Sequence, residues 1–123
     1  MGLFLRLADV VVMGGSFAPA LGLAPVGGHN PLEPARLAKP AVTGPDASNW
    51  AAVTEALVRA GGLAVVDAPS DLPGVLGPLL ASPDAAKAMG ERARRAAAEA
   101  NGGLDLLWSR LSALLPPAEA RRR

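Results

Sequence analysis

Short apolar runs alternate with longer mixed stretches along this chain. Residues 10–13, 41–43 and 63–66 form three such runs, and the first of them, Val-Val-Val-Met, contains no polar side chain. Unbroken apolar runs of this length, bounded by glycines, are typical of strands that are buried on both faces of a parallel sheet. The pattern therefore predicts three strands in one sheet, with the strand at residues 10–13 buried on both faces.

Stretches at helical spacing lie between and after these runs. We expect helices at residues 31–37, 48–60 and 71–80, and a longer one from residue 82 onward. In the second of these, Val53, Leu57 and Ala60 fall on one face, as a helix packed on a sheet requires. A last apolar set repeats at helical spacing near the end of the chain: Leu104, Leu107, Trp108, Leu111, Leu114 and Leu115.

Capping residues mark where these helices are expected to begin and end. Ser48 or Asn49 can cap the second helix, and Gly61-Gly62 is a typical stop. Ser82-Pro83 is a cap and first-turn pair for the longest helix. We expect Asn101-Gly102-Gly103 to break or kink that helix.

Strand and helix alternate three times with short connections, an order that builds parallel βαβ units. A length of 123 residues suits one domain with a real core. We therefore predict an α/β chain with three or so parallel strands and flanking helices. The domain is expected over residues 1–115, followed by a disordered tail at 116–123.

Composition and charge exclude several classes of function. A net charge of +1, with both signs interspersed, gives no basic patch of the kind that binds nucleic acid. The absence of cysteine excludes disulfides and thiolate metal sites, and we expect neither a metal nor a cofactor. Residues 10–28 are uncharged, but seven glycines and prolines interrupt them, so they are not expected to span a membrane.

The run Gly-Gly-His-Asn-Pro-Leu-Glu-Pro at residues 27–34 carries the most specific chemistry. Gly27 and Gly28 allow backbone to approach a ligand closely, and the helix start that follows favours a phosphate. Glu33 can accept hydrogen bonds from the hydroxyls of a ribose, while His29 and Asn30 supply donors and acceptors at the rim. This run predicts a site for a sugar nucleotide.

The same spacing has a purely structural interpretation. Asn30, Pro31 and Glu33 match a capping box, in which Glu33 turns back to the helix start, and spacing alone favours this interpretation. Pro34 predicts either a distorted first turn or a helix that begins only at Pro34 with Glu33 as its cap. His29, the single histidine, is expected to act as a structural hydrogen bonder rather than a catalyst. Gly14-Gly15 is a weak phosphate signal, since glycines after a strand often serve the turn alone.

These motifs closely resemble the Kdo transferases of lipopolysaccharide synthesis, which move 3-deoxy-manno-octulosonic acid (Kdo) from CMP-Kdo onto a lipid A precursor. The resemblance covers nearly the whole chain, and the run at residues 27–34 is its specific element. It also rests on residues 7–16, Lys39-Pro40, Gly44-Pro45, Asn49, Met89-Gly90 and Asn101-Gly102.

The resemblance implies a GT-B enzyme with two facing Rossmann-like domains, of which this chain is a carboxyl-terminal, CMP-binding part. Gly14, Gly15 and Ser16 would lie near the donor, which is CMP-Kdo or CMP. Gly28 and His29 would approach its phosphate, and Asn30 and Glu33 its phosphate or ribose. On this basis we favour Glu33 as a ligand residue that also helps to cap.

The lipid acceptor and the general base belong to the other domain of the family. The resemblance therefore implies no catalytic residue in this chain and contact with the lipid A precursor only through that domain. The family acts at the cytoplasmic face of the inner membrane, so we expect a cytoplasmic chain.

Two departures from the family pattern affect the predicted site. Residues 17–26 form a loop of ten residues where the family has only a few. Asp46-Ala47-Ser48-Asn49-Trp50 stands where family members often have His-Thr-Phe-Asn-Phe. A carboxylate near a bound anion is expected to weaken donor binding unless Asp46 points away from it.

The first seven residues resemble an interior stretch of the family. We therefore expect a fragment that does not catalyse alone, with the strand at residues 10–13 at an edge or beside an uncovered surface. Self-association through this exposed core is expected. The alternative is a stand-alone nucleotide-binding or protein-interaction module.

Overall fold

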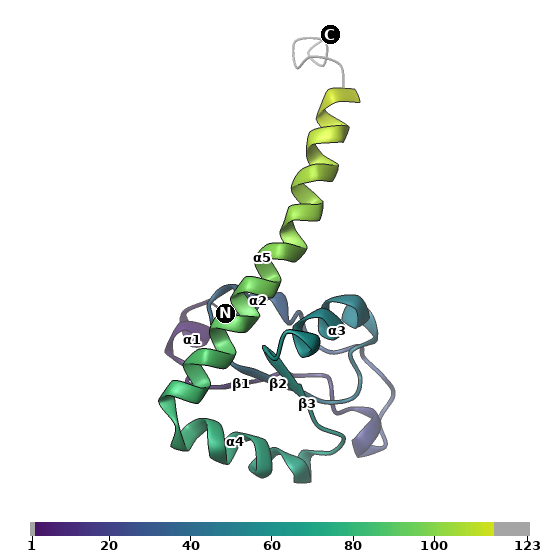
Figure 1. Ribbon diagram of the computed structural model, residues 1–123. Helices are drawn as coiled ribbons and strands as arrows, with labels where there is room; N and C mark the ends of the chain where they lie inside the picture. Colours follow the sequence, from purple (N-terminus) through teal and green to yellow (C-terminus); the bar gives the residue numbers. More distant parts are fainter. Residues whose placement is uncertain (1, 115–123) are drawn as a thin grey trace.

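The computed structural model describes the backbone of residues 2–114 and the side chains of residues 2–100, 110 and 111 (Figure 1). The tail expected at residues 116–123 lies outside the described residues.

Three parallel strands form the sheet, as predicted. They are β1 (Val11–Val12), β2 (Ala41–Thr43) and β3 (Leu63–Val65), in the order β1-β2-β3. Val11 pairs with Ala41, and Ala41 with Leu63, so these three residues lie in one row across the sheet. The fold class is therefore α/β with flanking helices, as the alternation of apolar runs indicated.

Strand β1 lies at the edge of this sheet, and it is not buried on both faces. Val12 is 42% exposed, whereas its neighbour Val42 in the central strand is fully buried. An unbroken apolar run does not distinguish the two positions, because burial of an edge strand depends on what packs beside it. The expectation of an edge is confirmed for the described residues.

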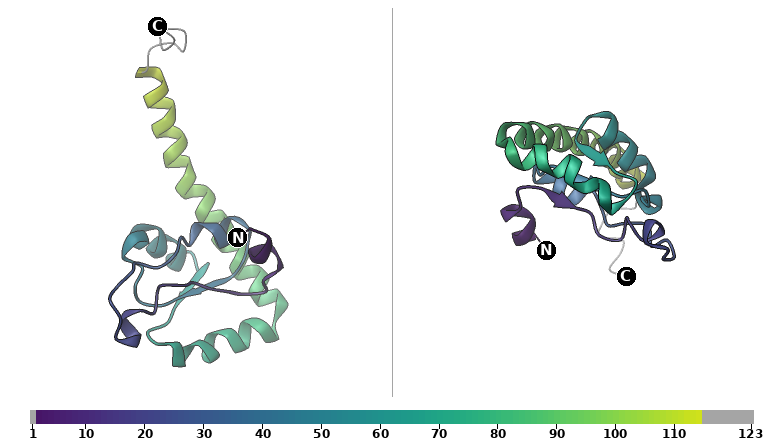
Figure 2. Two further views of the ribbon diagram at one scale, coloured as in Figure 1. Left: turned by 180° about the vertical axis from the view of Figure 1, so that it is seen from behind. Right: turned by 90° about the horizontal axis from the view of Figure 1, so that it is seen from below.

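Within residues 2–114, five helices and three short 3₁₀ turns surround the sheet. The helices are α1 (Gly2–Leu7), α2 (Leu32–Arg36), α3 (Ala51–Arg59), α4 (Leu72–Ala81) and α5 (Pro83–Leu114). The turns are η1 (Pro19–Leu21), η2 (Ser48–Trp50) and η3 (Pro69–Asp71). Helix α1 had no counterpart among the predicted elements. Figure 2 shows β1 and α1 at one side of the molecule and α3, α4 and α5 at the other.

The predicted helix ends are partly wrong. Neither Ser48 nor Asn49 caps α3, because both lie in η2 and α3 has no side-chain cap. The cap at Ser82 is confirmed, since its Oγ accepts the Ala85 N–H at 3.3 Å. Helix α5 runs unbroken through residues 101–103. Asparagine and glycine lower helix propensity but keep their N–H groups, so unlike proline they do not remove a helical hydrogen bond.

The core joins the sheet to α2, α3 and α5. Its buried members are mostly small: Met13, Ala35, Ala41, Leu57, Leu63, Ala93, Ala96 and Ala97. Val53 and Ala60 pack against this cluster, which confirms the predicted buried face of α3. Small side chains let α5 approach neighbouring backbone closely. Gly90 lies against the Ala38 carbonyl, and Gly62 against Ala93.

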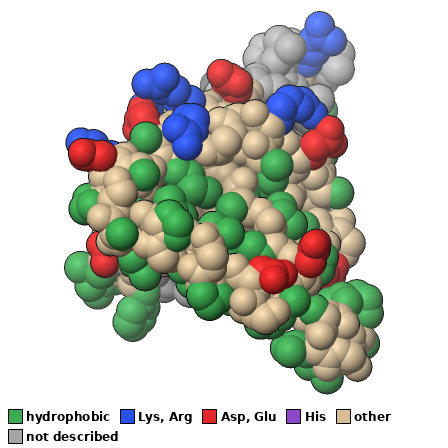
Figure 3. Space-filling model, turned by 60° about the horizontal axis from the view of Figure 1, so that its bottom comes forward, with side chains coloured by type: hydrophobic (Ala, Val, Ile, Leu, Met, Phe, Trp, Pro, Cys, Tyr) green, Lys and Arg blue, Asp and Glu red, His purple; other side chains and the backbone are tan. Residues whose placement is uncertain are grey.

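Apolar side chains also cover much of the outer surface. Figure 3 shows the face that carries α4, where apolar side chains occupy the centre and basic ones gather along one margin. None of the helices within residues 2–114 is both long and apolar enough to cross a membrane.

The contact of α5 with Ala38 predicts the effect of substituting Gly90. A Gly→Ala change in a helix normally stabilises by about 0.5–1 kcal/mol. In Gly90→Ala the new methyl group would collide with the Ala38 carbonyl, so we expect the free energy of unfolding to fall by about 1–3 kcal/mol. Gly74→Ala in α4 is the matched control, because no atom beyond the adjacent residues and the backbone of its own helix lies within 4 Å of the added carbon, and it should stabilise the chain. Urea denaturation of both variants tests the pair, and equal effects would contradict this packing.

Candidate functional site

The carboxyl ends of β1 and β2 are tied together by Ser16. This residue is fully buried, its Oγ donates to the Met13 carbonyl at 2.7 Å, and it accepts the Gly44 N–H at 2.8 Å. The Asp46 N–H donates to the Ser16 carbonyl at 3.0 Å. Ser16 was predicted to lie near the sugar-nucleotide donor. In the structure its hydroxyl joins two loops of the protein and orients them.

Asp46 holds the end of the long loop. Its side chain is buried, and Oδ2 accepts the N–H groups of Gly27 at 2.8 Å and Val26 at 2.9 Å. Its Oδ1 accepts the hydroxyl of Ser48 at 2.9 Å. These hydrogen bonds, led by that of the Gly27 N–H, hold the pKa of Asp46 below its ordinary value although burial opposes them. The sequence did not predict that Asp46 holds this loop, because Asp46 was considered only as a neighbour of the bound sugar nucleotide.

The loop at residues 17–26 is ordered by its own contacts. It turns through η1, and the Leu23 N–H donates to the Ala18 carbonyl at 2.9 Å. The Nδ2 of Asn49 donates to the Val26 carbonyl at 3.2 Å, so Val26 is held by Asn49 at its carbonyl and by Asp46 at its N–H. Hydrogen bonds at Val26 therefore hold the end of this long loop against the rest of the protein.

The conformation of the chain at the end of this loop requires glycine at positions 27 and 28. Both have positive φ, of 83° and 65°, which L side chains rarely adopt. A Cβ at Gly28 would lie 2.7 Å from the Asp46 carbonyl oxygen, and one at Gly27 would collide with Asn49. The sequence predicted that these glycines let the backbone approach a ligand closely. In the structure they instead approach Asp46 and Asn49 of the protein itself.

Helix α2 begins at Leu32, and Glu33 makes no capping bond. Asn30 accepts the Leu32 N–H on Oδ1 at 3.0 Å, while Pro31, which occupies the N-cap position, makes no side-chain hydrogen bond to the helix. Of the two alternatives predicted for this helix start, the one that begins only at Pro34 with Glu33 as cap is wrong. The Asn30 half of the predicted capping box forms and the Glu33 half does not, so the exposed Glu33 carboxylate lies outside the first-turn hydrogen bonding.

His29 lies across the loop that follows β1. Its backbone N–H donates to the Gly14 carbonyl at 3.1 Å, and a Cβ built at Gly14 would lie 3.2 Å from the His29 ring. The absence of a side chain at Gly14 therefore makes room for the imidazole. His29 itself is exposed, so its ring is within reach of a molecule in solution.

One cavity of about 150 Å³ brings four of the seven predicted residues together. Gly14, His29, Asn30 and Glu33 line it. The rest of its wall comes from Leu5, Val11, Val12, Met13 and Pro34. Gly15, Ser16 and Gly28 are not among the lining residues. Leu5 was missed because α1 was not expected.

The size of this cavity limits what it can hold. Pockets for drug-sized ligands usually measure about 300–1,000 Å³, so a whole nucleotide does not fit inside it. The arrangement offers a carboxylate, an imidazole and an amide around a partly apolar floor. Such a set can hydrogen-bond the hydroxyl or phosphate groups of one end of a ligand.

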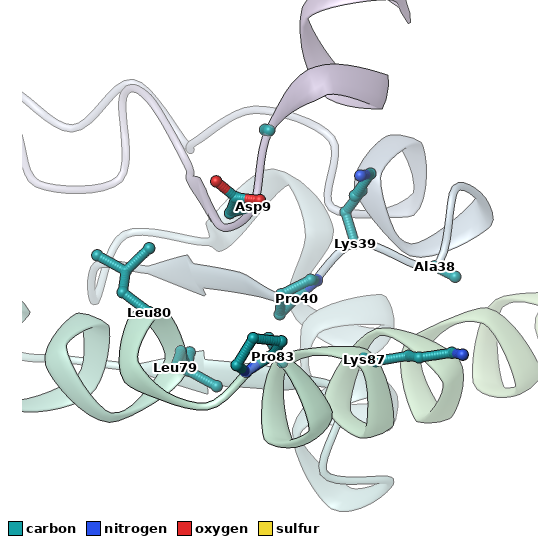
Figure 4. Close-up of a pocket in the computed structure, with 10 residues that line it drawn as sticks. Asp9, Ala38, Lys39, Pro40, Leu79, Leu80, Pro83 and Lys87 are labelled. Carbon is teal, nitrogen blue, oxygen red and sulfur yellow. The ribbon is translucent and has the colours of Figure 1, made fainter.

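A second cavity, of about 390 Å³, lies at the opposite ends of the strands (Figure 4). Asp9, just before β1, and Pro40, just before β2, place it at the amino ends of the strands. Lys39 and Lys87 stand on its wall beside Leu79 and Leu80. None of the seven predicted site residues lines it. Ligands of parallel sheets usually bind at the carboxyl edge, which favours the smaller cavity.

No family model matches this sequence. The structure is similar to the crystal structure of the C-terminal CMP-Kdo binding domain of WaaA from Acinetobacter baumannii, with a TM-score of 0.69 and 26% sequence identity. The match covers 77% of this chain and 47% of that chain, so this chain spans about half the length of the solved domain. The α/β arrangement with three parallel strands is like that of the solved domain.

The Asp46 contacts predict a pH-dependent contribution to stability. Because the pKa of Asp46 is lower in the folded chain than in the unfolded one, its contribution is present above the unfolded pKa and is lost as pH falls through the folded pKa. We expect Asp46→Asn to be less stable than the natural chain at about pH 6, with the gap closing below about pH 4. Urea denaturation of both chains across this range measures the gap. A gap that stays constant with pH would show that the charge of Asp46 does not contribute.

Proposed function

We propose that residues 1–115 are a carboxyl-terminal portion of a Kdo transferase and that they bind the CMP part of CMP-Kdo. The observation that carries the proposal is the cavity at the end of β1, where Gly14, His29, Asn30 and Glu33 meet. The similarity to a solved CMP-Kdo binding domain supports it independently of the cavity.

Each residue has a role in this proposal that fits its surroundings. Glu33 is exposed and makes no cap, so its carboxylate accepts hydrogen bonds from the ribose hydroxyls. His29 and the amide of Asn30 meet the phosphate from the rim. Gly14 leaves room for the His29 ring at the rim because it has no side chain, while Gly15, Ser16 and Gly28 shape the neighbouring turns without lining the cavity.

The proposed site is one part of a larger one. A cavity of about 150 Å³ accommodates a ribose or a phosphate, and the remainder of the donor lies outside it. The lipid A precursor and the general base would be supplied by the other domain of a GT-B enzyme. We therefore propose binding by this chain without turnover, in lipopolysaccharide biosynthesis at the cytoplasmic side of the inner membrane.

Titration of the chain with CMP by calorimetry tests the proposed site. We expect weak binding that becomes at least about tenfold weaker in Glu33→Ala, since hydrogen bonds to a charged group contribute about 1.5–3 kcal/mol. Glu99→Ala is the matched control, because Glu99 is an exposed glutamate of α5 outside this cavity, and it should bind CMP like the natural chain. Equal loss in both variants, or no binding by the natural chain, would contradict the site.

Turnover is tested separately with radiolabelled CMP-Kdo and a lipid A precursor. We expect no transfer of Kdo by the purified chain at any concentration at which CMP binds. Transfer that depends on the chain, and that disappears in Glu33→Ala, would overturn the proposal that this chain only binds the donor.

A further inference from the structure

Asp46 joins two loops that are far apart in the sequence. Its backbone N–H donates to the Ser16 carbonyl at 3.0 Å, in the loop that follows β1. Its carboxylate accepts the N–H groups of Gly27 at 2.8 Å and Val26 at 2.9 Å, and the nearby Asn49 amide donates to the Val26 carbonyl at 3.2 Å. One short segment, residues 46–49, therefore holds both backbone polar groups of Val26 and places them relative to the end of β1.

Two glycines connect these contacts to the rim of the small cavity. A Cβ at Gly28 would lie 2.7 Å from the Asp46 carbonyl oxygen, so the backbone passes directly against the Asp46 segment. The next residue is His29, whose backbone N–H donates to the Gly14 carbonyl at 3.1 Å. Gly27 and Gly28 are thus fixed on both sides, although glycine allows more backbone conformations than any other residue. The hydrogen bonds that start at the end of β1 return to it at Gly14.

Removing the Asp46 carboxylate would free this run. The Gly27 N–H is buried and would lose its acceptor, and an unpaired buried N–H costs free energy that the chain recovers by opening to water. Residues 26–28 would then sample other conformations, and the His29 ring would no longer be confined next to Gly14. The cavity wall would be complete in only a fraction of the molecules, and the apparent affinity for a ligand falls in proportion to that fraction.

We propose that Asp46 is a positioning residue, which holds the His29 ring next to Gly14 and thereby sets the affinity of the cavity for a ligand with ribose or phosphate groups. The first part concerns the ligand-free chain, and the second rests on the proposed function. Asp46 does not line the cavity, whereas His29 and Gly14 do. Its carboxylate is already bonded to neutral donors of the protein, two backbone N–H groups and the hydroxyl of Ser48. Asp46 therefore acts on the ligand only through His29.

Nuclear magnetic resonance of the His29 ring tests the first part without any ligand. His29 is the single histidine of the chain, so its ring signals are assigned directly. In the natural chain we expect a nuclear Overhauser effect (NOE) between the ring and the α-protons of Gly14, which lie close to it. Asp46→Ala should lose this NOE. In a calorimetric titration, the same variant should bind CMP at least about tenfold more weakly than the natural chain.

A matched control separates positioning from a general loss of stability. Gly62 precedes β3 at the amino ends of the strands and lies against Ala93 of α5, so Gly62→Ala should destabilise the chain through packing far from the cavity. We expect Gly62→Ala to keep both the NOE and the affinity for CMP. Circular dichroism melts show which variants are folded at the temperature of the measurements.

Asn49→Ala keeps the test decisive if Asp46→Ala does not fold. Asn49 is exposed, and its loss removes one hydrogen bond to the same run, so the variant should fold, show a weaker NOE and bind CMP more weakly. An NOE that is absent from the natural chain, or unchanged in whichever of these two variants is folded, would overturn the proposal. Equal loss of CMP affinity in Gly62→Ala would overturn it as well. A natural chain that shows the NOE but binds no CMP would contradict the proposed function, and the NOE comparison would still decide whether Asp46 positions His29.

Discussion

Removing the carboxylate of Asp46 from water costs solvation free energy, and the donors that surround it offset that cost. Two of these donors are the backbone N–H groups of Val26 and Gly27, and a third is the hydroxyl of Ser48. Because Val26 ends the ten-residue loop and Gly27 follows it directly, Asp46 determines where that loop returns to the sheet. The backbone then passes directly through Gly28 to His29, whose N–H meets Gly14. The candidate site therefore depends on a residue that does not line its cavity.

This dependence explains which parts of the site could be predicted from the sequence. Gly14 follows one strand, His29 and Asn30 precede one helix, and Glu33 lies in the first turn of that helix, so the rule that ligands bind at the carboxyl ends of parallel strands brings them together. The backbone partners of Asp46 lie 19 and 20 residues away, at the end of a loop that has no regular sequence pattern. No local rule assigns such a contact. For the same reason Ser48, which looked like a helix cap, donates to Asp46 instead.

The fold follows the same division between local and long-range information. The strand at residues 41–43 and the buried face of α3 could be predicted because apolar runs and helical spacing are local patterns. The exposure of Val12 could not, since it depends on the absence of a neighbouring strand in the described sheet. Helix α1 has too few residues for a periodic pattern, and the glycines at 102 and 103 weaken a helix without interrupting its hydrogen bonds.

The position of α5 in the chain has a consequence for how the protein folds as it is made. Ala93, Ala96 and Ala97 of this helix belong to the same buried cluster as Ala35 of α2 and Leu57 of α3. The two βα units are synthesised first, yet their shared apolar surface remains open until those alanines have left the ribosome. Nascent chains with such uncovered surfaces are prone to aggregate and are typical clients of chaperones. The closing step of folding therefore belongs to the last third of the sequence, after every strand of the sheet has been made.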